Sequence, residues 1–309
     1  MKKTLMVVAA LACSVSLFAQ TSAQDYLARY RLLVGKLGYD GVGIETLVNK
    51  WEADFPEDVD MLCAKFNYYF TKCQQPQIVP KEQERFLGAE PVLSLKDSTG
   101  KKVNYFQEVF YDDEMFGSAS QALDKAIRLR PAQIDLRLSK ITSLLSYEKE
   151  SPDMATQSIQ GLIDYHYAAH PVWTYGTEPF SEEDFRSSMV EYGYHLFRTA
   201  SPASLESFKS VSEKMLAYNP KDPDFLNNLG SYYLVARKDY KTAQKYYTKT
   251  LKLDPDNYAA VRNCVIISRK LSNPKMEKKY LQLLMRVSPD ETEQASAKVR
   301  LEALKSSGR

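Results

Sequence analysis

The 309-residue chain contains few of the side chains that carry catalysis. It has 4 cysteines and 3 histidines, and it lacks a glycine-rich phosphate loop, a nucleophile elbow and a CxxC pair. A catalytic cysteine–histidine pair would need an activated thiolate, whereas Cys264 takes a core position of its predicted helix. We therefore predict that the protein is not an enzyme and binds no cofactor.

Cysteines are also too few for a disulfide framework. Removal of an N-terminal signal would leave Cys63, Cys73 and Cys264, an odd and sparse set. On one straight helix Cys63 and Cys73 would lie ~15 Å apart, beyond the ~7 Å between Cα atoms that a disulfide allows. A bond between them would require the helix to end before Cys73, so we expect buried thiols.

Two of the histidines have the spacing of a metal-binding pair. His166 and His170 lie four residues apart and would face one side of a helix. No third ligand is close in sequence, although His195 could approach in space, and no glutamate stands between them to act as a base. Surface or helix-end histidines are the ordinary case, so we predict no metal site.

Acidic residues gather at 112–114 and at 182–184. Both clusters precede or open a predicted helix, where carboxylates favour the positive end of the helix dipole. A paired-carboxylate hydrolase would need such acids to face each other across a pocket, so we favour their role as helix starts.

Neither sign of charge is in excess. The chain has 41 Lys and Arg against 39 Asp and Glu, and loss of Lys2 and Lys3 with a signal would make the two classes equal. Phosphate binding needs clustered positive charge, so the absence of a basic run predicts no nucleic-acid partner. Beyond the N-terminus no apolar run approaches the ~20 residues that span a bilayer, so we predict no transmembrane segment.

The N-terminus has the pattern of a secretory signal peptide. Two lysines precede an apolar run over residues 5–12, and small residues follow. Cleavage fits after Ala19 or, with a better small-x-small match, after Ala23. We predict a signal over residues 1–23, one mature domain over 24–309, and export to a bacterial periplasm. Secretion is an alternative, and so is lipid anchorage at Cys13, although Ala10 stands at a key position of the lipobox pattern.

The strongest pattern is an internal repeat whose unit has the length of one helix pair. Pro220, Pro255 and Pro289 are spaced by 35 and 34 residues. Between the first two prolines, residues at helical spacing predict one helix over 224–236 and a second over 240–253. The residues that carry the pattern are Leu226, Leu229, Gly230 and Tyr233 on the first helix, and Ala243 and Tyr247 on the second.

This pattern resembles the tetratricopeptide repeat, a unit of two antiparallel helices. The resemblance is specific over 220–289, moderate over 25–131, and rests on periodicity elsewhere. It implies an all-α solenoid of helix-turn-helix units, with five to six helix pairs and a closing helix over 292–305 in the 290–309 tail. Gly230 is expected where the partner helix approaches too closely for a side chain. Glu277 stands where a small residue is usual, so we expect looser packing there.

Residues 74–115 interrupt one helix pair between its two helices. Alternation of apolar and polar residues over 92–96 and 102–111, around a turn at 97–100, predicts a small β-hairpin. A lone hairpin is marginal in water, so its apolar side chains are expected to pack on the helices. The insertion is either a binding arm that projects from the array or a decoration that seals a helix edge.

Residues 170–180 are rich in aromatic and chain-breaking residues and are too long for an ordinary turn between repeats. Trp173 and Tyr175 could form a ligand platform for a sugar ring or a peptide. The alternative is that they cover the apolar end of a neighbouring helix, as large aromatic residues usually do.

The resemblance also implies a binding surface, because first helices in the family line a concave groove that takes peptides or partner helices. Asn and Arg side chains suit extended backbones and carboxylates, and a plain solvated surface is the alternative. A carboxylate clamp of the chaperone-binding kind is not predicted, because Ala259 and Asn263 replace the expected Lys and Arg. The predicted groove residues are Asn227, Asn228, Ser231, Val235, Arg262, Asn263, Ile266 and Arg269.

The sequence therefore predicts an exported protein-interaction scaffold in an envelope assembly, which holds a peptide or partner protein in its groove. No motif identifies that partner. A small-molecule or glycan binder that uses Trp173, Tyr175 and the hairpin is the first alternative. An enzyme that uses His166 and His170 is the second.

Overall fold

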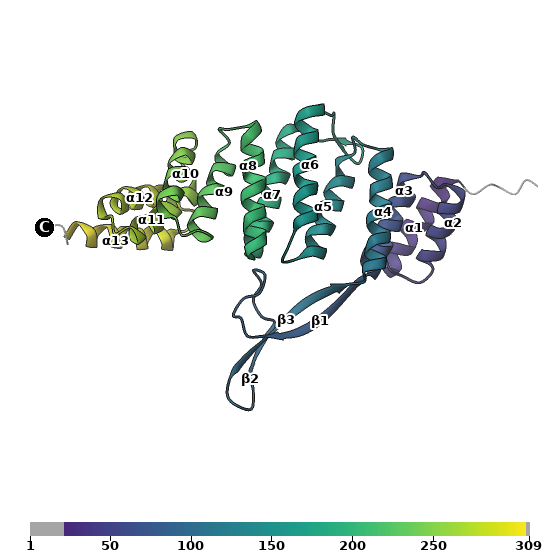
Figure 1. The fold of residues 1–309 in the computed structure, drawn as a ribbon, viewed down its shortest axis with the longest axis horizontal. Coiled ribbons are helices and arrows are strands. Elements are labelled where there is room, and N and C mark those ends of the chain that lie inside the picture. The colour runs from purple at the N-terminus through teal and green to yellow at the C-terminus, as the bar shows by residue number, and fades with distance from the viewer. Residues whose placement is uncertain (1–21, 307–309) are drawn as a thin grey trace, which may run out of the picture.

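The computed structural model describes residues 22–306, which form a row of packed helices with one β-sheet extending from it (Figure 1). The all-α solenoid of helix-turn-helix units predicted from the sequence is confirmed. Within the described residues the pairs are α1 (Ala23–Leu37) with α2 (Ile44–Asp54), α3 (Val59–Lys72) with α4 (Asp113–Leu129), α5 (Ile134–Glu148) with α6 (Asp153–Ala169), α7 (Glu182–Thr199) with α8 (Pro202–Tyr218), α9 (Pro223–Val235) with α10 (Tyr240–Leu253), and α11 (Tyr258–Lys270) with α12 (Pro274–Val287), followed by α13 (Glu291–Ser306).

The predicted signal peptide lies outside the described residues except for its last two positions. Ser22 is the N-cap of α1: its hydroxyl accepts a hydrogen bond from the Asp25 backbone, and the Asp25 carboxylate accepts one from the Ser22 backbone. Such a capping box stabilises a helix start. Cleavage after Ala19 would keep this cap, whereas cleavage after Ala23 would remove it. In the described part of the chain, no helix has the length and apolar character needed to cross a bilayer.

Polar caps determine where the helices begin. The side chains of Asp112, Ser181 and Asp222 accept hydrogen bonds from backbone N–H groups in the first turns of α4, α7 and α9. Each bond satisfies a donor that the helix itself leaves unpaired. The acidic clusters at 112–114 and 182–184 therefore open helices, as predicted.

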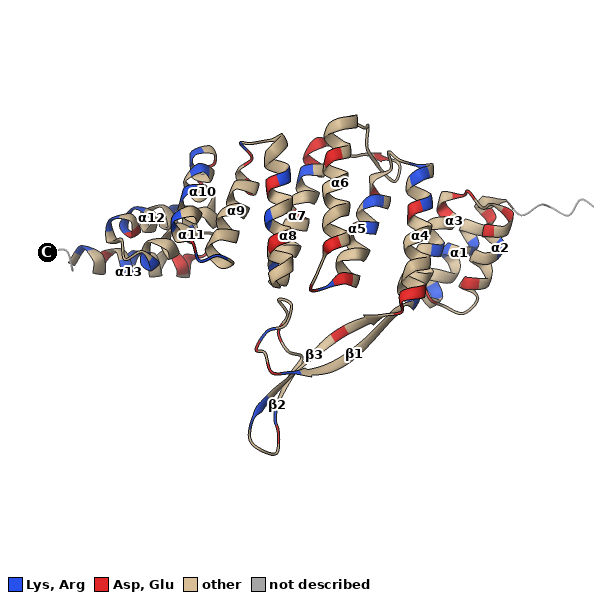
Figure 2. Ribbon diagram, viewed as in Figure 1, with Lys and Arg blue, Asp and Glu red and all other residues tan. Residues whose placement is uncertain are grey.

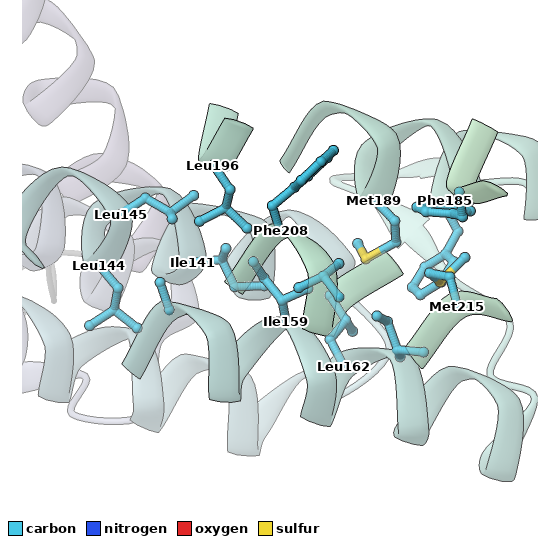
Figure 3. Close-up of a cluster of buried hydrophobic side chains, with 14 of the residues drawn as sticks. Ile141, Leu144, Leu145, Ile159, Leu162, Phe185, Met189, Leu196, Phe208 and Met215 are labelled. Atoms are coloured by element: carbon cyan, nitrogen blue, oxygen red, sulfur yellow. The ribbon is translucent and has the colours of Figure 1, made fainter. Parts of the chain in front are cut away.

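Three apolar clusters follow one another along the array. The central cluster joins α5, α6, α7 and α8 and is shown in Figure 3. It includes Ile141, Ile159, Phe185, Met189 and Phe208, each of which is at most 2% exposed. One cluster precedes it around Trp51, and one follows it around α10 to α13. Each helix pair thus buries its apolar stripe against its neighbours, which is how a solenoid builds a continuous core.

The close approach predicted at Gly230 is present between α9 and α10. A Cβ atom on Gly230 would lie 2.6 Å from Cε1 of Tyr247, whose ring is fully buried. The Tyr247 hydroxyl, in turn, accepts a hydrogen bond from Nδ2 of Asn263 at 2.9 Å and lies 3.1 Å from the Ser231 hydroxyl. One tyrosine therefore joins α9, α10 and α11, and the resemblance to the tetratricopeptide repeat is borne out by this packing.

The insertion between α3 and α4 is a three-stranded antiparallel sheet, which we call the arm. Its strands are β1 (Gln74–Lys81), β2 (Leu93–Lys96) and β3 (Lys102–Tyr111), in the order β1-β3-β2. The predicted β2–β3 hairpin is confirmed. Strand β1 was not predicted, because Pro76 and Pro80 are unfavourable inside sheets and are tolerated at an edge such as this one.

The arm does not project freely along its whole length. Glu108 on β3 forms ion pairs with Lys81, at 2.9 Å, and with Lys149 in the α5–α6 turn, at 3.9 Å. Phe106 is buried beneath the loop that joins β1 to β2, in edge contact with Phe86. That loop reaches α7, where Gly88 lies directly against the carbonyl oxygen of Arg198. The arm thus touches two successive helix pairs.

Candidate functional site

The first helices of the last three pairs, α7, α9 and α11, follow one another in a row, since α9 contacts both α7 and α11, and the closing helix α13 comes after them. All eight predicted groove residues lie on α9 and α11. Figure 2 shows Lys and Arg positions interspersed with Asp and Glu positions along most of the array. Two cavities along this row of helices are lined by predicted groove residues.

Three predicted groove residues, Arg262, Ile266 and Arg269, line one cavity of about 200 Å3 between α11 and α13. Arg262 pairs with Glu293 on α13, with 3.0 Å between Nε and Oε1. Both arginine side chains keep about half of their surface exposed. This cavity therefore has an aliphatic wall at Ile266 and cationic edges that a ligand can reach.

The looser packing expected at Glu277 is wrong. Glu277 is 3% exposed, and its carboxylate accepts hydrogen bonds from Arg269 at 2.8 Å and from Arg300 at 2.9 and 3.1 Å. Hydrogen bonds from Arg300 and Arg269 lower the pKa of Glu277, although burial acts in the opposite direction. A long acid fits a small-residue position because two arginines on α11 and α13 neutralise it.

This arrangement predicts a pH-dependent contribution to stability. A carboxylate with a lowered pKa stabilises the folded state above its unfolded pKa of ~4.3, and the contribution is lost as the pH falls through the lower, folded value. We expect Glu277→Gln to lower the free energy of unfolding by about 1.5 kcal/mol at pH 7. Denaturant titrations at pH 7 and in acid measure this difference, which should shrink in acid. A difference independent of pH would contradict the ion-pair role.

The polar residues of α9 divide into two kinds. Ser231 is already engaged with Tyr247, as is Asn263 on α11. Asn227 and Asn228 are different, because Oδ1 of the first and Nδ2 of the second are buried without a hydrogen-bond partner in the described part of the chain. An unpaired buried polar atom costs ~1–3 kcal/mol.

Val235, the remaining predicted residue, lines a much larger cavity of about 970 Å3. Its other walls are the last two turns of α7, with Tyr194, Phe197 and Arg198, and the arm loop over residues 85–90. None of these residues was predicted from the sequence as part of a site. The aromatic Tyr194 on the exposed face of α7 could have indicated an interaction site. The approach of a loop from more than a hundred residues away has no signal in the sequence.

The predicted platform at Trp173 and Tyr175 is only half accessible. Trp173 is 3% exposed and donates a hydrogen bond from Nε1 to Nδ1 of His166 at 2.9 Å, so its indole belongs to the core. Tyr175 is 56% exposed, stacks on Phe180 and lines a cavity of about 400 Å3 that also includes His195. The two residues lie in or beside the short hairpin β4 (Thr174–Tyr175) and β5 (Glu178–Pro179).

His166, Cys73 and Cys264 are buried in the packed core. His166 uses both ring nitrogens, one on Trp173 and the other on Glu182 at 2.8 Å. Within residues 22–306, no three His, Cys, Asp or Glu side chains are grouped as a metal site. Burial raises the pKa of Cys264 to about 12 and that of Cys73 to about 11. These thiols are therefore protonated at neutral pH and, as expected, unbridged.

Comparisons with known proteins report likeness only among solved structures. No family model matches the chain, and no curated protein matches it. The chain is similar to PilF of Pseudomonas aeruginosa, at 11% sequence identity and a TM-score of 0.37, over 90% of this chain and 97% of that one. It is also similar to the flexible tandem repeat domain of a bacterial cellulose synthase component, at 16% identity and a TM-score of 0.26, over 93% and 98%. Both scores are low, and neither likeness indicates a binding site in this chain.

Proposed function

We propose that the protein is an exported, non-catalytic scaffold that binds a peptide or a segment of a partner protein along the row α7, α9, α11 and α13. The observation that carries the proposal is the position of the predicted groove residues. Val235, Arg262, Ile266 and Arg269 come from two helix units, yet all four line cavities on this one row of helices. Concave sites with apolar walls and a few polar groups are where ligands usually bind.

The chemistry of the row fits a polypeptide ligand. Ile266 offers aliphatic surface, and Arg262 and Arg269, each about half exposed, offer donors to carboxylates. Asn227 and Asn228 are half-buried, and their amides are of the kind that pairs with a peptide backbone. Nucleic acid is not the proposed ligand, because phosphate binding needs clustered positive charge, and the chain has 41 Lys and Arg against 39 Asp and Glu. The signal pattern over residues 1–23 supports a periplasmic location for this activity.

The glycan alternative has less support. Trp173, half of the predicted platform, is buried, which leaves Tyr175 as the aromatic residue of the pair that reaches a cavity. Trp51 is also buried. Quenching of tryptophan fluorescence by a sugar would therefore report a rearrangement of the core rather than contact at the surface.

Photo-crosslinking in cells tests the scaffold proposal. A photoreactive phenylalanine would replace Ile266 in one strain and Leu253, an exposed apolar residue of α10, in a control strain. We expect one partner to be captured from position 266 and not from 253. The purified partner should then bind Ile266→Ser at least about tenfold more weakly than the parent chain, which corresponds to ~1.4 kcal/mol. Equal capture from both positions, or none from 266, would reject the groove as the binding surface.

A further inference from the structure

The loop between β1 and β2 forms one wall of the cavity that contains Val235, and we call this cavity the arm pocket. Residues 85–90 of the loop face Tyr194, Phe197 and Arg198 at the end of α7. A plain array of helix pairs has no counterpart to this wall, because each repeat contacts only its neighbours. The insertion therefore adds a walled compartment at the edge of the proposed binding surface.

Several contacts hold the loop in this position. Gly88 has a φ of +75°, and no side chain could stand between it and the Arg198 carbonyl. Phe86 packs on Phe106, with 6.0 Å between ring centroids, and the Lys81 ammonium lies 3.5 Å from the Phe86 ring centroid. Nδ2 of Asn104 donates to the Gln83 carbonyl at 2.8 Å. The wall is thus built into the fold on the arm's inner face.

The floor of the arm pocket is apolar and open to solvent. Tyr194 is 62% exposed and Val235 is also exposed, while Leu87 and Phe197 are half-buried. Exposed apolar side chains that gather in a concavity mark interaction sites, whereas scattered ones do not. Burial of this surface by a ligand would recover ~25 cal/mol for each Å2 removed from water.

The edge of the arm pocket carries one uncompensated charge. Within residues 22–306, the Arg198 guanidinium forms no ion pair or side-chain hydrogen bond, whereas Arg85 on the opposite edge is paired with Glu90. An arginine beside an apolar floor favours a carboxylate that follows or precedes a bulky apolar group, because the fork of N–H donors matches a carboxylate. The complementary ligand is therefore an apolar residue next to an acidic one.

We propose that the arm pocket determines which peptide the scaffold accepts. It takes a bulky apolar side chain between the arm loop and α7, and Arg198 pairs with a neighbouring Asp or Glu of the same peptide. This inference rests on the proposed function, since the rest of the peptide would lie along α9 and α11. It assigns the insertion a role in recognition and leaves the β2–β3 end of the arm outside the site.

A selection with displayed peptides tests the proposal. A random library of short peptides would be selected on the full mature chain and, in parallel, on Arg198→Glu. The parent chain is expected to enrich peptides with an acidic residue beside Trp, Phe or Leu, and Arg198→Glu to enrich a basic residue in the same place. A synthetic peptide of the parent consensus should bind Tyr194→Ser and Arg198→Glu at least about tenfold more weakly.

Two further variants separate the arm from the groove. Gly88→Ala should displace the loop from α7 and weaken binding of the same peptide, although Tyr194 and Arg198 are unchanged. Leu253→Ser is the control and should leave the affinity for this peptide unchanged. Circular dichroism would verify that each variant is folded. If Ile266→Ser weakens peptide binding but Tyr194→Ser, Arg198→Glu and Gly88→Ala do not, the arm-pocket proposal is wrong and the scaffold proposal stands. Failure to enrich any peptide would overturn both.

Discussion

Replacement of Arg186 by alanine is expected to destabilise the protein by about 3 kcal/mol, because it would leave a buried carboxylate without its counter-charge. Arg186 on α7 donates to both oxygens of Asp222, at 2.6 and 3.0 Å, and also pairs with Asp224. Asp222 is 2% exposed and caps α9 through its side chain. Hydrogen bonding to Asp222 raises the pKa of Arg186 further above its already high value. The loss of stability therefore reflects the loss of an ion pair that connects the α7–α8 pair to the α9–α10 pair.

A double-mutant cycle distinguishes this from a simple loss of contacts. Asp222→Asn removes the charge but keeps an oxygen that can cap α9, so the double variant with Arg186→Ala should be more stable than Arg186→Ala alone. Denaturant unfolding of the four proteins measures the coupling. Strictly additive changes, or a change below about 1 kcal/mol for Arg186→Ala, would show that Asp222 does not depend on this arginine.

Gly230→Val is expected to cost about 3 kcal/mol, because the space for a side chain is already filled by the Tyr247 ring. A Cβ atom alone would lie 2.6, 2.8 and 2.9 Å from three atoms of that ring, and the ring has no free volume to enter because it is fully buried. Displacement of Tyr247 would also break its bonds to Ser231 and Asn263. The loss should therefore spread over α9, α10 and α11.

Gly161 supplies the matched control for this substitution. It also lies within a helix, α6, but a Cβ atom there would meet nothing within 4 Å. Gly161→Val should change the stability by less than about 1 kcal/mol, because helix propensity is then the main term. Hydrogen exchange of α9 to α11, with denaturant unfolding, compares the two variants. Equal effects at both glycines would contradict the close approach.

Much of the helical array could be predicted because its information is local. The helices predicted over 224–236 and 240–253 are observed at Pro223–Val235 and Tyr240–Leu253. Apolar spacing, an Asp–Pro start and a glycine at a fixed position all act within one repeat, so a single sequence reveals them. The arm's return to α7 could not be found in this way. Its contact joins Gly88 to Arg198 through an irregular loop, and no periodicity connects the two positions.

The candidate site was predicted less completely, because a polar side chain on a helix face can either face solvent or form a hydrogen bond to a neighbouring helix. Ser231 and Asn263 were expected to face a ligand, yet the buried hydroxyl of Tyr247 engages both. For Trp173 the sequence left a ligand platform and a core position open, and the ring nitrogen of His166 accepts its N–H in the core. Such choices depend on distant polar groups. Val235, Ile266, Arg262 and Arg269 line cavities, and their role in binding stays a prediction.

The contact of the arm with α7 also has a mechanical consequence. In a simple solenoid each unit holds only the next, so the array can bend at every junction and can unravel from an end one pair at a time. The arm begins between α3 and α4 and contacts both the turn after α5 and the last turn of α7. These contacts connect three successive helix pairs across the two junctions between them. Bending and unravelling from the ends should therefore concentrate in the pair α1–α2 and in the helices beyond α8, while the units from α3 to α8 move and unfold together.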